Sequence, residues 1–202
     1  MTLLAALPFF AVADVQSDFE AGKKAFDRGD VSGSMAPLRR AADAGHAKAQ
    51  ALYGYVMDIS EFDAEAYAYY KKSADQGDAD GQYGLAQMYV TGEAGKKDLK
   101  LARDWMEKAA SQGHAQAIMT LADAYITGGL AIEPAERESP QALKAVQAAV
   151  ELNSLTALTA MQAAYTTGRY GLPIDPAKAA EMEAKIRAIK PELGGKKKRR
   201  SL

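Results

Sequence analysis

The sequence of 202 residues contains no cysteine, only two histidines and a single tryptophan. The lack of cysteine excludes disulfide bonds and thiolate chemistry, although it does not fix the cellular compartment. Patterns typical of enzymes are missing as well: there is no Gly-x-Ser-x-Gly turn, no phosphate-binding glycine loop and no His-Glu-x-x-His zinc pattern. We therefore expect a protein that is not an enzyme, with no catalytic residues, no metal site, no cofactor and no small-molecule substrate.

Charge is nearly balanced over the chain but unevenly distributed. There are 25 basic and 26 acidic residues. Five of the basic residues are consecutive, namely Lys196, Lys197, Lys198, Arg199 and Arg200. The rest of the chain is therefore acidic, and we predict that residues 191–202 form a basic, flexible C-terminal tail.

An apolar run from Leu3 to Ala13 is too short to span a bilayer. It ends in Ala11-Val12-Ala13, the small-x-small pattern that precedes signal-peptide cleavage, although no lysine or arginine comes before it. We predict that residues 1–13 are a signal peptide and that the protein is periplasmic or secreted. The alternative is an apolar segment that packs on the first repeat of a cytoplasmic protein.

Three near-copies of one phrase occur along the chain, and such self-similarity indicates a repeat protein. They are Gly45-His46-Ala47-Lys48-Ala49, Gly77-Asp78-Ala79-Asp80-Gly81 and Gly113-His114-Ala115-Gln116-Ala117. Each is followed by a large apolar residue, a small residue and an aromatic or apolar residue on one helical stripe, and then by a second amphipathic run. The pattern predicts two helices per repeat.

The spacing between repeats varies in one place only. Successive phrases are 32, 36 and 40 residues apart, with Asn153 replacing the glycine of the fourth. The loop between the two helices takes 6, 10 and 14 of these residues, so the remaining 26 are constant. Identical units that stack on one another require such constancy, and loops accommodate the insertions.

Local signals agree with a helical reading. Hydrogen-bonding residues stand where each second helix should begin, namely Asp63, Asp98, Ser139 and Asp175. Glycines that can adopt a left-handed conformation close the preceding helices, namely Gly45, Gly77 and Gly113. The two histidines, His46 and His114, share one repeat position, so the repeat accounts for them without a metal or catalytic role.

The third repeat resembles the Sel-like repeat, a bacterial branch of the tetratricopeptide superfamily. The matching residues are Leu85, Tyr89, Gly92, Ala102, Trp105, Lys108, Ala109, Ala110, Gly113 and His114, whereas Gly81 and Ala86 depart from the pattern. Weaker copies cover most of the chain. The resemblance implies an all-α, right-handed α-solenoid of about five helix-turn-helix repeats over residues 14–190, with Leu85 and Trp105 in its core.

The same resemblance implies a scaffold or adaptor that binds a protein or peptide segment in a concave groove lined by the first helix of each repeat, in a complex of the cell envelope. By analogy with the tetratricopeptide peptide groove, the partner-binding positions are Tyr55, Tyr83, Gln87, Met119, Asp123 and Thr159. We expect an extended ligand with a basic or apolar side chain near Asp123. The alternative is a protein whose tail, Lys196–Arg200, anchors it to an anionic membrane or nucleic-acid surface.

Overall fold

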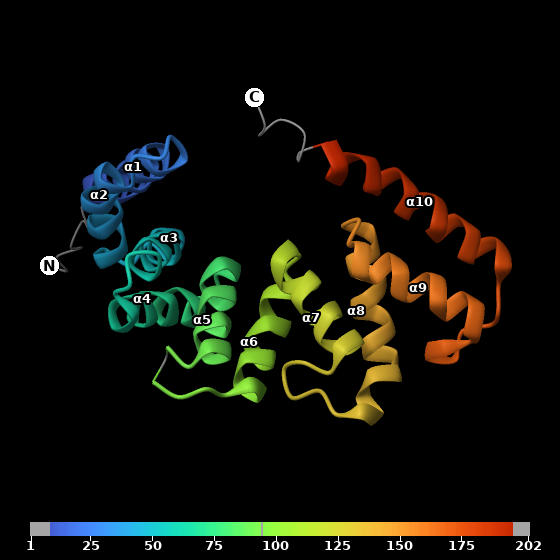
Figure 1. The fold of residues 1–202 in the computed structure, drawn as a ribbon. Helices are drawn as coiled ribbons and strands as arrows, with labels where there is room; N and C mark the ends of the chain where they lie inside the picture. The colour runs from blue at the N-terminus through green and yellow to red at the C-terminus, as the bar shows by residue number, and fades with distance from the viewer. Residues whose placement is uncertain (1–8, 94, 196–202) are drawn as a thin grey trace, which may run out of the picture. The chain divides into compact units, whose positions relative to one another are not determined.

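The computed structural model describes residues 9–93 and 95–195, and these form ten α-helices arranged as five consecutive pairs (Figure 1). The prediction of an all-α solenoid with five helix pairs is confirmed. The α-helices are α1 (Phe9–Asp27), α2 (Val31–Asp43), α3 (Ala47–Asp58), α4 (Asp63–Asp75), α5 (Ala79–Thr91), α6 (Leu99–Ser111), α7 (Ala115–Thr127), α8 (Pro140–Glu151), α9 (Leu155–Thr167) and α10 (Pro176–Gly195). Two short 3-10 helices, η1 (Pro134–Glu138) and η2 (Arg169–Gly171), lie in the loops after α7 and α9.

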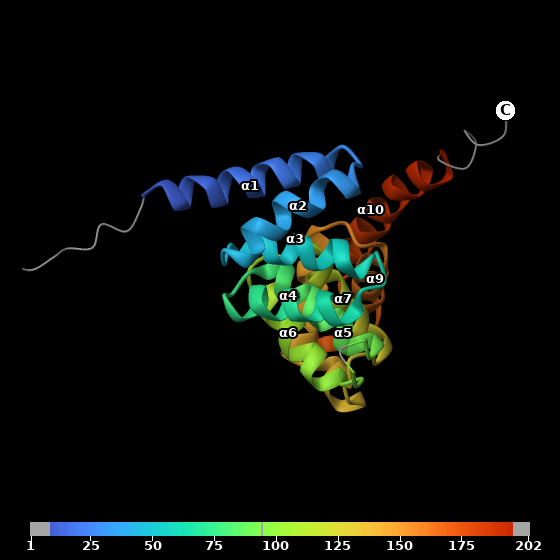
Figure 2. The same cartoon turned by 90° about the vertical axis from the view of Figure 1, so that its left-hand side faces the viewer.

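The chain divides into two compact units, residues 1–109 and 110–202. In the first unit α1 packs on α2, α2 on α3, α3 on α4 and α4 on α5, and α3 also packs on α5. Figure 2 shows α1 and α2 side by side with α3 next to them. The core of this unit is made by buried apolar side chains of α2 to α5, among them Leu38, Val56, Met57, Leu85 and Met88.

In the second unit α7 packs on α8, α8 on α9 and α9 on α10. Its buried side chains include Leu121 and Tyr125 of α7, Val146 of α8 and Leu158 of α9. The loop before α8 adds Leu130 and Ile132 to this core. The second unit therefore draws part of its core from a loop, which the repeat pattern does not indicate.

The turn between repeats has the same construction each time. Gly45, Gly77 and Gly113 have φ of +94°, +88° and +84°, and Asn153 takes the same left-handed region with φ 56°. The next residue then caps the following helix by accepting a hydrogen bond from the amide three positions on. These N-caps are His46, Asp78, His114 and Ser154. The two histidines therefore start helices, through Nδ1, as their shared repeat position suggested.

Three of the four predicted starts of second helices are confirmed. Asp98, Ser139 and Asp175 each accept hydrogen bonds from first-turn amides. The prediction for Asp63 is wrong by one residue, because Phe62 occupies the N-cap and makes no side-chain hydrogen bond. Asp63 is the first residue of α4, where its negative charge is favourable for the helix dipole.

Two further predictions need correction. Trp105 is only partly buried at the edge of the first core, with the Lys108 Nζ 3.6 Å from the centre of its ring, while the adjacent Met106 is completely buried. The sequence also placed the end of the array at residue 190, whereas α10 continues to Gly195. The residues after 176 are mostly good helix formers, and no helix-ending glycine occurs before Gly194.

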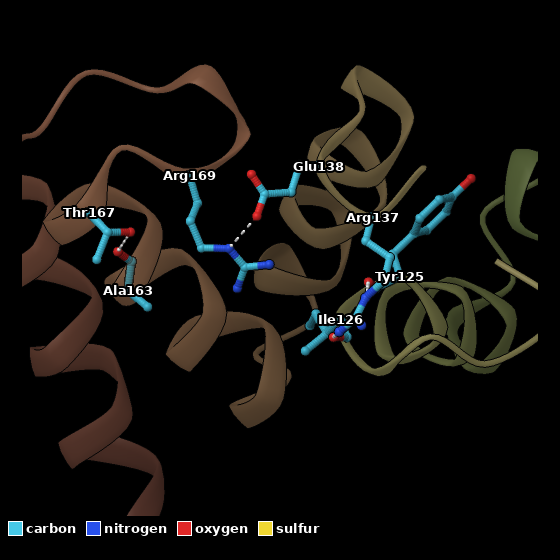
Figure 3. A network of polar contacts seen from close by, with 7 residues as sticks. All are labelled: Tyr125, Ile126, Arg137, Glu138, Ala163, Thr167 and Arg169. Carbon is cyan, nitrogen blue, oxygen red and sulfur yellow. Dashed lines mark hydrogen bonds and ion pairs between the residues drawn. The ribbon is translucent and has the colours of Figure 1, made fainter. Parts of the chain in front are cut away.

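The two long loops within repeats differ in how they are held. Every described residue from Glu93 to Asp98 is exposed, whereas the loop before α8 buries Leu130 and Ile132 and contains η1. Arg137 of η1 donates hydrogen bonds to the Tyr125 and Ile126 carbonyl oxygens at the end of α7 (Figure 3). The longer loop is thus the better anchored of the two.

We therefore expect trypsin to cut the native protein at Lys96 or Lys97 before it cuts at Arg137. Cleavage requires local unfolding, which costs little where no side chain is buried and more where a packed loop must open. Mass spectrometry of early fragments identifies the first cut. Cleavage after Arg137 ahead of the shorter loop would show that the packing of Leu130 and Ile132 does not protect it.

Candidate binding surface

Tyr70 of α4 lies between two glycines of neighbouring first helices. A Cβ atom on Gly84 of α5 would be 2.3 Å from its ring, and one on Gly54 of α3 would be 3.0 Å away. The glycines thus allow two helix backbones to approach the faces of one aromatic ring. The Tyr70 hydroxyl donates a hydrogen bond of 3.2 Å to Asp58 Oδ2 at the end of α3.

The pKa of the Tyr70 hydroxyl is raised by burial and by nearby ionisable groups. Burial raises the pKa of Tyr70 strongly, and the negative charge of Asp58 and the ionisable hydroxyls of Tyr55 and Tyr83 raise it further. Tyr55 comes from α3 and Tyr83 from α5, and α3 and α5 are in direct contact. Tyr55 and Tyr83 therefore belong to two adjacent helices, and both helices approach Tyr70 closely at Gly54 and Gly84.

Large apolar side chains on either side of Asp58 in the sequence are exposed. Tyr55, Ile59 and Phe62 have exposed fractions of 44%, 50% and 57%. Tyr55 and Ile59 are four residues apart, hence on one face at the end of α3, and Phe62 follows in the turn to α4. Exposed apolar side chains that are grouped in this way are typical of interaction sites, whereas scattered ones are ordinary.

Carboxylates flank these apolar side chains. Burial raises the pKa of Asp58, the hydrogen bond from Tyr70 lowers it, and the nearby charges of Glu93 and Asp63 raise it. Neither Asp58 nor Asp63 forms an ion pair with any residue that the structure describes. We call the surface formed by Tyr55, Asp58, Ile59, Phe62 and Asp63 the aromatic–acidic patch.

The third predicted position in the first unit is Gln87. It lies one turn after Tyr83 on α5 and is partly exposed, as Tyr83 is. Tyr55, Tyr83 and Gln87 thus all reach the surface of the first unit. Asp58, Ile59 and Phe62 were not selected as binding residues from the sequence. They lie at the end of α3 or in the turn to α4, outside the repeated helical stripe from which the positions were chosen.

The other three predicted positions belong to the second unit. Met119 and Asp123 are partly buried on α7, and the Asp123 Oδ1 is buried without a hydrogen-bond partner. Thr159 of α9 is exposed and lines a shallow cavity of about 400 Å³. The cavity lies between α7 and α9 and is mainly apolar, lined also by Ile126, Leu155, Thr156, Ala160, Ala163 and Arg169.

Arg169 contributes the charge at this cavity, and its position is fixed from two sides. Its Nε donates a 3.1 Å hydrogen bond to Glu138 Oε1 of η1 (Figure 3). Its guanidinium also lies over the Tyr170 ring. Tyr170 is buried in the left-handed conformation, with φ 57°. No spacing in the sequence indicated Arg169, because the loops that hold it differ in length between repeats.

Some predictions concern residues that the structure does not describe. The basic tail residues Lys196–Arg200 lie outside the described ranges, as do the first eight residues of the predicted signal peptide. Among the described side chains, no group of three or more His, Asp or Glu residues is arranged to hold a metal ion. No helix within the described part of the chain is both long and apolar enough to cross a membrane.

The raised pKa of Asp58 leads to a prediction about stability. The folded state holds this proton more tightly than the unfolded chain does, so ionisation of Asp58 at neutral pH costs stability. This cost disappears as the pH falls through the folded pKa towards the unfolded value of about 3.9. Asp58→Asn, which keeps an acceptor for Tyr70, should therefore raise the free energy of unfolding at pH 7.

Urea unfolding at several pH values measures this effect. The advantage of Asp58→Asn over the unmodified protein should shrink towards pH 4, where the wild-type carboxyl becomes neutral. Asp104→Asn, at an exposed position on α6, is the matched control and should change little. A loss of stability in Asp58→Asn at every pH would show that the Asp58 carboxylate stabilises the fold as a hydrogen-bond partner and that its charge does not destabilise it.

Comparison with known proteins identifies the repeat. The model of the Sel1 repeat family matches residues 63–78, 79–114 and 159–182. No curated protein sequence matches the chain significantly. The segment 79–114 contains the pair α5 and α6, whereas 63–78 contains α4 and 159–182 runs from within α9 into α10.

Several solved structures are similar. A protective antigen of uropathogenic Escherichia coli strains, which displays an SLR fold, is 26% identical with a TM-score of 0.71; the similarity covers 87% of this chain and 38% of that one. A Sel1 repeat protein from Oxalobacter formigenes is 24% identical with a TM-score of 0.65, over 87% and 72% of the two chains. The MamA protein, at 19% identity and a TM-score of 0.52 over 94% and 96%, shares the fold alone.

The chain thus spans well under half the length of the Escherichia coli antigen that it resembles. Sel1-repeat proteins generally serve as scaffolds for protein–protein interaction and are typically not enzymes. The repeated helix pairs, the constant turns between them and the match of the family model to three segments show that this chain contains Sel1-type repeats and is similar to Sel1-repeat proteins.

Proposed function

We propose that this protein is a non-enzymatic scaffold that binds an extended segment of a partner protein along the first helices of its repeats. The observation that carries the proposal is the aromatic–acidic patch, where three of the largest exposed apolar side chains fall within eight residues. Aromatic side chains are common anchors of protein interfaces, since they bury much area at little entropic cost. The scaffold role typical of Sel1-repeat proteins supports the same interpretation.

The chemistry of the patch favours a ligand that is both apolar and basic. Tyr55, Ile59 and Phe62 offer contact area, and Asp58 and Asp63 offer charge to a lysine or arginine. This agrees with our expectation of a basic or apolar side chain in the ligand, but moves the acidic partner from Asp123 to Asp58. The cavity beside Thr159 is a second contact point, of mainly apolar character.

The proposal includes the place where the scaffold works. We propose export to the periplasm and a role in a complex of the cell envelope, supported by the apolar run that ends at Ala13. Cleavage there would shorten α1, which begins at Phe9, to a helix that starts near Asp14. Mass spectrometry of the protein from periplasmic extract tests this, and an intact Met1 on the exported or cytoplasmic protein would contradict it.

Selection of peptides from a displayed random library tests the binding role. We expect peptides rich in aromatic and basic residues to bind the unmodified protein. Tyr55→Ala or Tyr83→Ala should weaken them by about 30-fold or more, equivalent to about 2 kcal/mol, because aromatic anchors dominate such interfaces. Fluorescence anisotropy with a labelled peptide measures the change, while circular dichroism and melting confirm that each variant is folded.

Lys144→Ala is the control, since Lys144 is exposed on α8 of the second unit. It should leave peptide binding unchanged. Loss of binding in this variant, together with normal binding in Tyr55→Ala and Tyr83→Ala, would place the binding surface elsewhere.

A further inference from the structure

Resting on the proposed function, we propose that the aromatic–acidic patch binds the basic C-terminal segment, Lys196–Arg200, of a second copy of this protein. The proposal names the occupant of a surface that is exposed and apolar, and that carries unpaired negative charge. It makes the patch a site that is occupied or freed according to competition between the protein's own tail and a partner segment.

The patch has the two features that a lysine or arginine side chain needs. The apolar stem of such a side chain packs on aromatic and aliphatic surface, here Tyr55, Ile59 and Phe62. Its charged end is attracted both by the faces of tyrosine and phenylalanine rings and by carboxylates. Asp58 and Asp63 supply the carboxylates within the same turn of chain.

The carboxylates of the patch differ from others in the first unit. Asp18, Asp27 and Asp75 each form an ion pair with an arginine or lysine. Asp58 and Asp63 form none in the described structure, and Glu93, whose charge reaches Asp58, hydrogen-bonds to Thr91. Lys96 and Lys97 on the following loop are exposed and form no ion pair with a described residue either.

The C-terminal segment is the complementary part of the chain. It places five positive charges in succession, followed by Ser201 and Leu202. A ligand with several adjacent cations suits a surface where the charges of Asp58, Asp63 and Glu93 act on one another, because it can neutralise more than one of them.

The test uses the full chain with all five basic tail residues replaced by glutamine, Lys196→Gln to Arg200→Gln. A fluorescent peptide with the sequence of residues 194–202 is titrated into it, and anisotropy gives the dissociation constant. We expect a micromolar dissociation constant that rises about tenfold or more between 50 and 300 mM salt, because the contact is largely between exposed charges.

Variants of the patch locate the peptide. Asp58→Asn/Asp63→Asn and Tyr55→Ala, each in the tail-neutralised chain, should each weaken the peptide about tenfold or more. Asp104→Asn, which also removes a carboxylate from the first unit, should change it less than about twofold, because distant exposed charges are screened. Failure of the peptide to bind, or equal binding by the patch variants and the control, would overturn the proposal.

Peptide binding to the unmodified protein tests whether the protein's own tail already occupies the patch. The unmodified protein should bind the added peptide more weakly than the tail-neutralised chain does. The difference should grow with protein concentration, because a second copy supplies the tail; a difference that does not change with concentration would contradict this source. Equal affinity of the two proteins at all concentrations would contradict occupation by the tail.

The test of tail binding can fail independently of the test of the proposed scaffold function. Should the tail peptide fail to bind while library-selected peptides bind and lose affinity in Tyr55→Ala, the scaffold function stands and the inference about the tail falls. Failure of both sets of peptides at the patch would remove the proposed surface itself.

Discussion

Replacing Leu85 by alanine should lower the free energy of unfolding by about 2–5 kcal/mol, because it deletes a buried side chain and leaves a cavity. Leu85 is only 1% exposed and belongs to the core that joins α2 to α5. Domains are stable by only about 5–15 kcal/mol, so a loss of this size should unfold a large share of the molecules at moderate temperature. Urea unfolding followed by circular dichroism measures it.

Trp105→Ala provides the comparison. Tryptophan-to-alanine changes in a full core cost about 3–5 kcal/mol, but Trp105 is partly exposed, so its loss should cost less than this and less than the loss of Leu85. The sequence alone suggested that both residues hold the stack. A larger loss in Trp105→Ala than in Leu85→Ala would show that the edge of the core carries more of the stability than its centre.

The second large effect is expected from adding one methyl group. Gly84→Ala would place a Cβ 2.3 Å from Cε1, 2.5 Å from Cδ1 and 2.6 Å from Cζ of the Tyr70 ring. Tyr70 is buried and Gly54 of α3 also lies close to its ring, which limits how far the ring can shift. Alanine favours a helix over glycine by about 1 kcal/mol. Overpacking costs about 1–3 kcal/mol or more, and we expect a net loss of about 2 kcal/mol.

A double-mutant cycle tests the cause of that loss. In a Tyr70→Leu background the ring is gone, so Gly84→Ala should be neutral or stabilising through its helix propensity. Urea unfolding of the four proteins gives the coupling energy. An equal cost of Gly84→Ala in both backgrounds would show that the methyl group meets something other than Tyr70.

The regular part of the fold could be predicted because it depends on local chemistry that repeats. A left-handed glycine followed by a capping residue marks each turn between repeats, and Asn153 and Ser154 perform the same two roles with different side chains. Constant spacing outside one loop then predicts stacked helix pairs. For the same reason the shared position of His46 and His114 explained both histidines before their role as N-caps was seen.

The parts that depend on contacts between distant residues required the structure. Met106 is completely buried whereas Trp105 is only partly buried, and which of two adjacent apolar residues on α6 faces the core depends on tertiary packing. Likewise Leu130 and Ile132 look like loop residues by position, yet the second unit buries them. The spacing between repeats predicts the length of the loop before α8, but it does not predict which residues the loop packs against.

The candidate surface shows the same division. Tyr55, Tyr83 and Gln87 were placed at the surface by their offset from a buried helical stripe, which is a local property. The hydrogen bond between Tyr70 and Asp58 was not predictable, because it requires Tyr70 of one helix to reach between Gly54 and Gly84 of two others. The sequence by itself determined the repeats and their turns, since neighbouring residues decide those. Only the tertiary structure decided which carboxylate lies without a cation beside exposed aromatic side chains, because that depends on how three helices pack.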